Sequence, residues 1–341
     1  MTEQPLVCIC IPTFNAELTI RDTLLSILSQ SYCNFVVHIS DNASTDNTIK
    51  VIEGVADSRV HIHRQVYNVG GEENFNNCIR LAEGKYTAIF HADDIYESEM
   101  VECQVAFLER HVQAGAVFTE ASLIDECGKK YGTIKFPDGL GSYNKLYDFE
   151  MIFKAVLRHS NFLICPSVMA RTCVYKKYIQ SWRGDLFKSS ADLDVWLRIS
   201  CKYPIGMLPA QLMRYRVGSN QFSAKVRVQI ERADFFLVTE HYLEQRSVSK
   251  ILNGIDIENY ACLDRRDRVM RAVNCFLNGR FEDSQNLLYD ACSWQAWKAG
   301  MLSKRGFGVL VAGVYLKLLL TLRLEATGRL TLVFLRRIMR K

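Results

Sequence analysis

The feature that most constrains the fold is an alternation of strand-like and helix-like patterns over the first hundred residues. It begins with Leu6–Ile11, six consecutive apolar residues that end at Pro12. An apolar run of that length is typical of a strand covered on both faces, as in a parallel sheet. Apolar residues at helical spacing follow, and later segments repeat the alternation: strand patterns at Phe35–Ile39, Val60–His63 and Tyr86–Phe90, and a helix pattern at Asn74–Ala82. These are successive βα units, so the sequence predicts an α/β fold.

Three polar clusters follow the predicted strands at their carboxyl ends, where open α/β sheets bind ligands. They are Pro12–Asn15, Asp41–Asp46 and the pair Asp93 and Asp94. Asn and Asp also favour turns and helix caps, which would explain one such cluster without a ligand. Three clusters at the same edge of one sheet indicate a binding site.

Several short motifs carry a resemblance to a known family. In chain order they are Ile11–Asn15, Ser26–Tyr32, Ser40–Asp46, Asn68–Gly70 with Asn74–Asn76, His91–Asp94, Asp192–Arg198 and, more weakly, Tyr215–Val217. Each motif is unspecific alone, but the ordered set over residues 5–225 resembles the family-two glycosyltransferases of the GT-A fold. The resemblance implies a Rossmann-like mixed sheet flanked by helices.

The resemblance also implies an inverting enzyme that moves a sugar from a nucleotide diphosphate sugar to an acceptor. On that basis Asp41 contacts the base of the nucleotide. Its carboxylate can accept a hydrogen bond from a pyrimidine N–H, which favours a uracil or thymine nucleotide, so a UDP-linked donor is expected. The other nucleotide-sugar contacts that the resemblance implies are Pro12, Thr13, Asn15, Asn68 and Asp93.

Asp93 and Asp94 are the predicted ligands of a divalent cation, Mg²⁺ or Mn²⁺. Such cations prefer carboxylate oxygens and bridge to phosphates, and the ion would stabilise the departing diphosphate. The family often carries Asp where this chain has His91, so one carboxylate is missing. Two roles for His91 stay open: a metal ligand through its neutral imidazole, or a hydrogen-bonding residue beside the sheet.

Asp192 matches the position at which inverting members of the family place the general base. A carboxylate there could take the proton of the acceptor hydroxyl, a role worth roughly 10²–10⁴ in rate. Alternatively, Asp192 stabilises the N-terminus of the helix that follows it, and both roles can hold together. Ala191 stands where the family often has Glu, so we expect fewer supporting groups around the base.

The composition turns helical beyond residue 225, which sets the predicted boundary between two domains. Residues 1–225 form the expected catalytic domain. Residues 226–341 form an α-helical C-terminal extension, with helix patterns at Arg227–Gln245, Asp264–Leu277 and Phe281–Tyr289.

The end of the chain, residues 301–341, is strongly basic. It carries nine Lys or Arg against one Glu, a charge of +8, whereas the other 300 residues sum to −3. This distribution does not indicate a nucleic-acid-binding body, and it favours contact between the tail and an anionic membrane surface. The 17 residues between Arg305 and Arg323 would form a helix of only ~25 Å, short of a ~30 Å hydrocarbon core. Two alternatives remain: a helix packed on the catalytic domain, or an interfacial helix that turns toward lipid its residues Phe307, Leu310, Val314, Leu318 and Leu322.

Twelve cysteines without paired C-x-x-C spacing, and the lack of a visible secretory signal pattern, favour a reducing compartment. We expect most of these cysteines to be small buried hydrophobic residues. The expected location is therefore cytoplasmic and peripheral on the inner face of the membrane. There the enzyme would extend a saccharide or lipid-linked saccharide acceptor in surface polysaccharide biosynthesis.

Two other functions compete with this interpretation. His91 and Ala191 would also suit a sugar-nucleotide-binding protein without turnover, such as a scaffold in polysaccharide assembly. A sugar-nucleotide pyrophosphorylase would need a Gly-rich basic loop after the first strand, where this chain has Pro12–Asn15.

Overall fold

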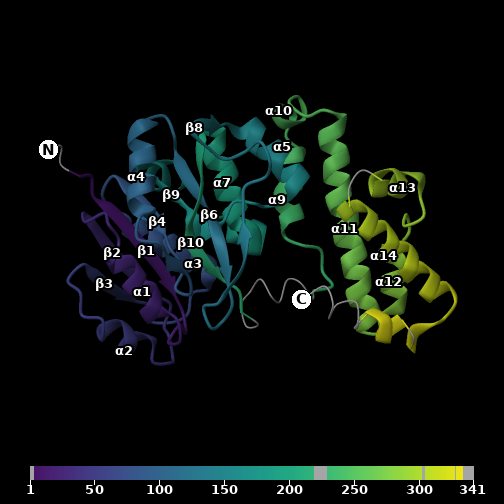
Figure 1. Ribbon diagram of the computed structural model, residues 1–341, viewed down its shortest axis with the longest axis horizontal. Helices are drawn as coiled ribbons and strands as arrows, with labels where there is room; N and C mark the ends of the chain where they lie inside the picture. The colour runs from purple at the N-terminus through teal and green to yellow at the C-terminus, as the bar shows by residue number, and fades with distance from the viewer. Residues whose placement is uncertain (1–3, 219–228, 302–303, 327, 333–341) are drawn as a thin grey trace. The chain divides into compact units, whose positions relative to one another are not determined.

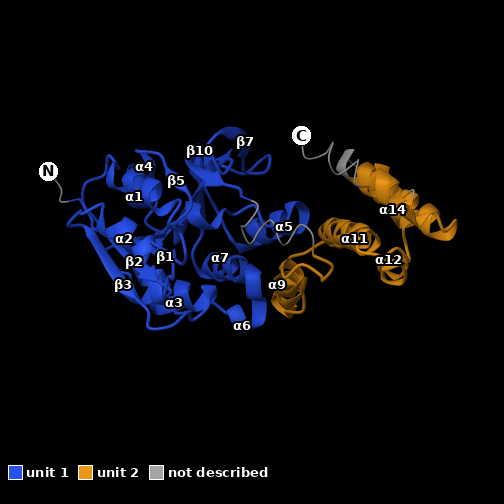
Figure 2. Cartoon of the chain, turned by 90° about the horizontal axis from the view of Figure 1, so that it is seen from below, with its two compact units in different colours: residues 1–218 blue, residues 219–341 orange. Residues whose placement is uncertain are grey.

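The computed structural model describes residues 4–218, 229–301, 304–326 and 328–332 (Figure 1). The chain divides into two compact units, Met1–Gly218 and Ser219–Lys341 (Figure 2). The predicted boundary between residues 225 and 226 lies outside the described residues.

The first unit begins with four parallel strands in the spatial order β3-β2-β1-β4. The helices between them connect each strand to the next, as the alternating pattern predicts. The elements of this half are β1 (Val7–Thr13), α1 (Ile20–Leu28), β2 (Phe35–Asp41), α2 (Thr48–Glu53), β3 (Val60–Arg64), α3 (Gly71–Leu81) and β4 (Tyr86–Ile89).

Both faces of β1 are covered, which explains its unbroken apolar sequence. Ile9 and Ile11 pack in one buried cluster with Ile20 and Leu24 of α1. Cys10 points to the opposite face, where its thiol donates to the carbonyl of Cys78 in α3 at 3.4 Å. Since successive side chains of a strand alternate between faces, only a strand covered on both sides can be apolar at every position.

The second half of the sheet is mixed. Strand β9 pairs antiparallel with both β4 and β6, and β6 pairs parallel with β10. The elements in chain order are β5 (Ile95–Tyr96), α4 (Met100–Arg110), β6 (Ala116–Ile124), β7 (Lys130–Ile134), β8 (Ser142–Tyr147), α5 (Phe149–His159), β9 (Met169–Arg171), α6 (Gly184–Phe187), α7 (Ala191–Lys202) and β10 (Ile205–Arg216), with short helical turns at Cys165–Ser167, Val174–Ile179 and Lys188–Ser190. The predicted α/β class with a mixed sheet flanked by helices is confirmed.

The described part of the second unit is helical, as predicted. Its helices are α9 (Phe235–Leu243), α10 (Arg246–Ser249), α11 (Gly254–Leu277), α12 (Phe281–Leu287), α13 (Trp294–Met301) and α14 (Lys304–Thr321). The longest, α11, begins at a capping box in which Asn253 and Asp256 each accept from the other's backbone N–H. Phe276 of α11, Leu288, and Leu316 and Leu319 of α14 form part of one buried cluster.

The position of α14 corrects one residue of the predicted lipid-facing set. Leu310 is only 5% exposed, because it packs beside Gly300 of α13. Phe307, Leu318 and Leu322 are exposed, and Val314 is half-buried. Of the helices that the structure describes, none is long and apolar enough to cross a membrane.

The cysteines also differ from the expectation. All twelve lie in described segments and are free thiols, but only Cys8, Cys10, Cys78 and Cys275 are buried. Five are exposed and three are intermediate. A thiol is small and only weakly polar, so a surface position costs little and the sequence pattern does not reveal it.

Candidate active site

Asp41 ends β2 at the carboxyl edge of the parallel strands, directly beside Thr13 of β1. Its carboxylate is fully buried, and Oδ2 accepts the backbone N–H of Ser44 at 3.1 Å. Arg64 Nε lies 3.8 Å from the same oxygen. Oδ1 has no hydrogen-bond partner within the described structure. A buried carboxylate oxygen without a donor is ready to accept one from a ligand.

The loops after β1 and β2 are tied to one another. Asn15 Oδ1 accepts the backbone N–H of Thr45 at 2.8 Å, and Ser44 Oγ accepts that of Asn15 at 2.9 Å. Asn15 and Ala43 have φ angles of 48° and 58°, a left-handed conformation that such contacts must maintain. The predicted ligand-binding residue Asn15 therefore also fixes the loop that carries Asp41.

Pro12, Thr13 and Phe14 extend this region at the end of β1. Thr13 is buried, so its side chain belongs to the floor, and Pro12 is half-buried. Phe14 exposes 47% of its surface, which is unusual for a large aromatic residue at a sheet edge. Our site prediction omitted Phe14, although it lies inside the quoted Ile11–Asn15 motif. Its exposed ring can stack on a planar base.

Asn68 is positioned by a network of amide side chains. Asn42 Nδ2 donates to Asn68 Oδ1 at 3.0 Å, and Asn68 Oδ1 also accepts the N–H of Gly70 at 2.9 Å. The buried Asn74 accepts from Ser40 Oγ at 2.7 Å and donates to the Ser40 carbonyl at 3.0 Å. These bonds join the loop before α3 to the end of β2, which places Asn68 in the same layer as Asp41.

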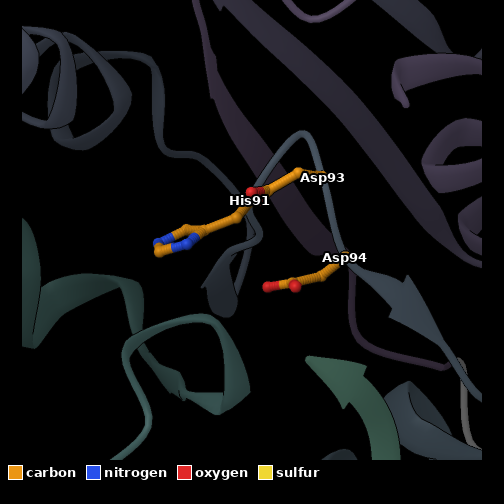
Figure 3. Close-up of side chains that lie close together, drawn as sticks. All are labelled: His91, Asp93 and Asp94. Atoms are coloured by element: carbon orange, nitrogen blue, oxygen red, sulfur yellow. The ribbon is translucent and has the colours of Figure 1, made fainter. Parts of the chain in front are cut away.

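His91, Asp93 and Asp94 form the third cluster, after β4. One potential ligand atom from each lies within 4.8 Å of the others, and Figure 3 shows the three side chains extending from the loop toward the same side. Oδ2 of Asp94 and Nε2 of His91 are buried and have no hydrogen-bond partner in the described part of the chain. Burial and the nearby Asp93 raise the pKa of Asp94 well above its usual range. Burial lowers the pKa of His91 and favours its neutral form.

This donor set fits a divalent cation. Carboxylate oxygen and neutral imidazole nitrogen are both metal ligands, and a bound ion would relieve the close approach of two carboxylates. Asp93, Asp94 and His91 are the residues that would hold it. The structure thus brings the two predicted metal ligands together and adds His91 beside them.

Arg216 of β10 holds the loop that carries these ligands. Its backbone N–H donates to Asp94 Oδ1 at 2.8 Å, and its Nε donates to the carbonyl of Asp93 at 2.8 Å. Its Nη1 donates to the carbonyls of Asp125 and Glu126, at 3.3 and 3.0 Å. Our site prediction omitted Arg216, although the weak Tyr215–Val217 motif contains it.

Asp192 lies in the first turn of α7, two residues after the N-cap position Ser190, whose side chain makes no capping hydrogen bond. Its Oδ1 accepts the N–H of Leu193 at 2.7 Å, and Asn161 Nδ2 lies 3.4 Å from Oδ2. Burial raises the pKa of the Asp192 carboxyl to about 6, although these two donors oppose the shift. A carboxylate with a raised pKa is a stronger proton acceptor than an ordinary Asp.

The phenol of Tyr215 is subject to the charges of both Asp192 and the Asp93–Asp94 pair. Burial raises the pKa of its phenol, and the charges of Asp94, Asp93 and Asp192 raise it further. All three carboxylates therefore lie close enough to act on one half-buried phenol.

A buried ion pair anchors α7 behind Asp192. Asp194 is fully buried and binds the guanidinium groups of Arg183 and Arg198, with Arg198 Nε at 2.9 Å. Breaking a buried ion pair of this kind strongly destabilises the protein, because it leaves a buried charge without its partner. The pair therefore fixes the first turn of the helix. Asp194 lies within the Asp192–Arg198 motif, and its role there is to hold the helix in place.

Comparison with known proteins identifies the family. Residues 8–179 match the family described as "Glycosyl transferase family 2". The chain belongs to glycosyltransferase family 2. An uncharacterized glycosyltransferase of Haemophilus influenzae is 25% identical over 284 residues, which cover 80% of this chain and 85% of the relative. In Escherichia coli, the UDP-Glc:alpha-D-GlcNAc-diphosphoundecaprenol beta-1,3-glucosyltransferase WfgD is 35% identical over 104 residues, 30% of this chain and 41% of the relative.

Two solved structures show that this glycosyltransferase has the predicted GT-A fold. S. aureus TarS 1-349 in complex with UDP-GlcNAc superposes with a TM-score of 0.59 at 16% identity, covering 95% of this chain and 92% of TarS. The mannosyltransferase PcManGT of Pyrobaculum calidifontis, in complex with GDP-Man and Mn2+, superposes with a TM-score of 0.56 at 16% identity, covering 93% and 88%. At these identities the likeness concerns the fold.

Proposed function

We propose that this glycosyltransferase moves a sugar from a UDP-linked donor to a saccharide acceptor, with inversion at the anomeric carbon. The observation that supports the proposal is the presence in the first unit of three groups: the open Oδ1 of Asp41, the His91–Asp93–Asp94 cluster and the raised-pKa carboxyl of Asp192. They match the three needs of the reaction, which are to hold a nucleoside, to neutralise a diphosphate and to accept a proton.

Asp41 accepts the N–H of the uracil ring at its open Oδ1. Arg64, close to the other carboxylate oxygen, is available to donate to a uracil carbonyl. Phe14 stacks on the base, while Thr13, Pro12, Asn15 and Asn68 line the floor and the ribose side. The UDP-GlcNAc complex of TarS and the UDP-Glc donor in the name of WfgD support a uridine nucleotide.

Asp93 and Asp94, with His91, hold a divalent cation, Mg²⁺ or Mn²⁺. When bound, such a cation acts as a Lewis acid toward the diphosphate. The Mn2+ of the PcManGT complex supports this assignment. Arg216 contributes by keeping the Asp93–Asp94 loop in one conformation before the donor arrives.

Asp192 takes the proton of the acceptor hydroxyl while that oxygen forms its bond to the anomeric carbon. The bond between that carbon and the diphosphate oxygen breaks, and its electron pair leaves with the nucleotide diphosphate. A single displacement inverts the configuration. Family membership and the raised pKa of Asp192 favour an enzyme over a binding scaffold.

The acceptor is a saccharide on a lipid carrier, and the enzyme works at the cytoplasmic face of a membrane in the synthesis of a surface polysaccharide. The diphosphoundecaprenol-linked acceptor in the name of WfgD supports a lipid-linked substrate.

The test is a panel of UDP-, dTDP- and GDP-sugars incubated with lipid-linked saccharide acceptors, with Mn²⁺ or with EDTA. Release of free nucleotide is measured, and the anomeric configuration of the product is determined by NMR. We expect acceptor-dependent release from a UDP-sugar, loss of release in EDTA, and an inverted product. Release from GDP-sugars alone would contradict the role given to Asp41, and a retained configuration would contradict the single displacement.

A further inference from the structure

Helix α14 has two apolar faces, and the residues that the structure describes bury one of them. Leu310, Leu316 and Leu319 are at most 5% exposed. The other face carries a line of apolar side chains that are half exposed or more: Phe307 (53%), Val311 (50%), Leu318 (54%) and Leu322 (62%). Spacings of four, seven and four residues place these side chains on one side of a helix with 3.6 residues per turn. We call these four residues the α14 stripe.

Helix α13 repeats the pattern. Its residues Ala296 and Gly300 are buried, and Gly300 lies so close to Leu310 of α14 that a side chain at position 300 would collide with it. The exposed side of α13 presents Trp294 (81%), Trp297 (48%) and Met301 (75%) at spacings of three and four. Two adjacent helices thus each leave apolar side chains uncovered, which a soluble monomer rarely tolerates over a large area.

The charges near the α14 stripe are unmatched. Lys317 and Arg323 make no ion pair with any residue that the structure describes. On α11, by contrast, Arg265 and Arg268 bind Asp290, and Arg271 binds Asp267. The sequence of residues 301–341 contains nine Lys or Arg and one Glu. An uncovered apolar line beside unpaired cations fits an anionic, amphipathic partner.

We propose that the α14 stripe, with the exposed side of α13, is the surface by which this enzyme lies on an anionic phospholipid bilayer. Phe307, Val311, Leu318 and Leu322 enter the region between headgroups and acyl chains. Trp294 and Trp297 lie at headgroup depth, where amphipathic rings are favoured. Lys317 and Arg323 bind lipid phosphates. The occupant is a bilayer rather than a second copy of this chain, because apposing two copies of the stripe would bring the like charges of Lys317 and Arg323 together.

This proposal deepens the proposed function by naming where a lipid-linked acceptor would be met, but its test does not depend on catalysis. The full-length protein is sedimented with vesicles of phosphatidylcholine alone or mixed with phosphatidylglycerol, at low and high salt. The double variant Val311→Asp/Leu318→Asp is compared with a matched control, Val112→Asp/Leu25→Asp, at exposed apolar positions of the first unit. Circular dichroism melting checks that both variants fold.

We expect the parent and the control to bind phosphatidylglycerol vesicles, with weaker but measurable binding at high salt, because salt screens only the charged part. The stripe variant should lose binding by about tenfold or more, since two apolar side chains become charged. Tryptophan emission should shift to the blue on binding in the parent. Failure of the parent to bind anionic vesicles, or equal binding by the stripe variant, would overturn the proposal. So would a parent that is dimeric without lipid and becomes monomeric through the stripe variant. Nucleotide release from UDP-sugars with a detergent-soluble acceptor reports on the proposed function separately.

Discussion

The backbone N–H of Arg216 donates to Oδ1 of Asp94 at 2.8 Å, while Oδ2 of that buried carboxylate has no hydrogen-bond partner among the described residues. The same residue uses its guanidinium to hold the carbonyls of Asp93, Asp125 and Glu126. One residue of β10 therefore fixes the loop after β4 that carries the candidate metal ligands. One carboxylate oxygen of Asp94 lies within 4.8 Å of a potential ligand atom of both His91 and Asp93.

Replacing Arg216 should destabilise the protein and weaken metal binding together. Arg216→Ala removes a buried side chain and its hydrogen bonds to the carbonyls of Asp93, Asp125 and Glu126, at a cost of about 2–4 kcal/mol. Arg214→Ala, two residues away on the same strand, is the matched control, because the Arg214 side chain is 45% exposed and its ion pair is with Glu97, a partly exposed residue. The control substitution should lower the free energy of unfolding by less than about 1 kcal/mol. Urea unfolding measures both, and equal losses would refute the special role of Arg216.

Asp192→Asn should lower turnover by roughly 10² or more while donor affinity stays within a few-fold, because only the proton acceptor is lost. In the parent, the rate should rise with pH through about 6, where the Asp192 carboxyl ionises. Steady-state kinetics and donor titration by calorimetry provide the two readouts. Turnover within a few-fold of the parent would assign the base to another group.

Asn161→Ala should move the pH dependence of the rate upward. The amide of Asn161 lies 3.4 Å from Asp192 Oδ2 and opposes the rise of that pKa, so its loss makes the carboxyl harder to ionise. Asn161 is a positioning residue, and its amide is oriented by the N–H of Leu163, which donates to Oδ1 at 3.1 Å. The maximal rate that is reached at high pH should change little. An unmoved acidic limb of the pH profile would contradict this role.

The raised pKa of Asp192 also predicts a stability change. Its value of about 6 in the folded protein exceeds the ordinary Asp value of about 4, so ionisation is less favourable in the folded state. The stability associated with the protonated carboxyl is complete below about pH 4 and is lost as the pH rises through about 6. Asp192→Asn should therefore be more stable than the parent at pH 7, by about 1–3 kcal/mol, and nearly equal to it at pH 4. Thermal melting of the parent and of Asp192→Asn at pH 7 and at pH 4 measures this difference. An equal difference at both pH values would contradict the prediction.

Two substitutions test the metal cluster by binding rather than activity. Asp93→Ala should abolish Mn²⁺-dependent binding of a UDP-sugar while the fold persists, because a partly exposed loop side chain contributes little to stability. His91→Ala should reduce Mn²⁺ affinity more than Mg²⁺ affinity, since imidazole suits transition metals and Mg²⁺ prefers oxygen. Electron paramagnetic resonance of Mn²⁺, with Mg²⁺ in competition, measures both. An unchanged preference in His91→Ala would leave His91 as a hydrogen-bonding residue beside the sheet.

The sequence by itself determined the order of strands and helices in the first hundred residues. Leu6–Ile11 is apolar throughout because both faces of β1 are covered. This requirement can be seen in the local sequence. The polar residues at the strand ends could be found in the same way, because the carboxyl edge of parallel strands is where ligands bind. The helical character of α11 and α14 followed from local composition as well.

Tertiary structure decided what depends on contacts between distant segments. The antiparallel pairing of β9 with β4 and the hydrogen bonds from Arg216 to Asp93 and Asp94 join residues that are far apart in the chain. No local pattern encodes them. The same holds for Leu310, which periodicity placed with the lipid-facing residues. It is buried because Gly300 has no side chain, and the space left there is filled by Leu310 of the neighbouring helix. Periodicity fixes the direction in which a side chain points, whereas its burial depends on what another segment places in that direction.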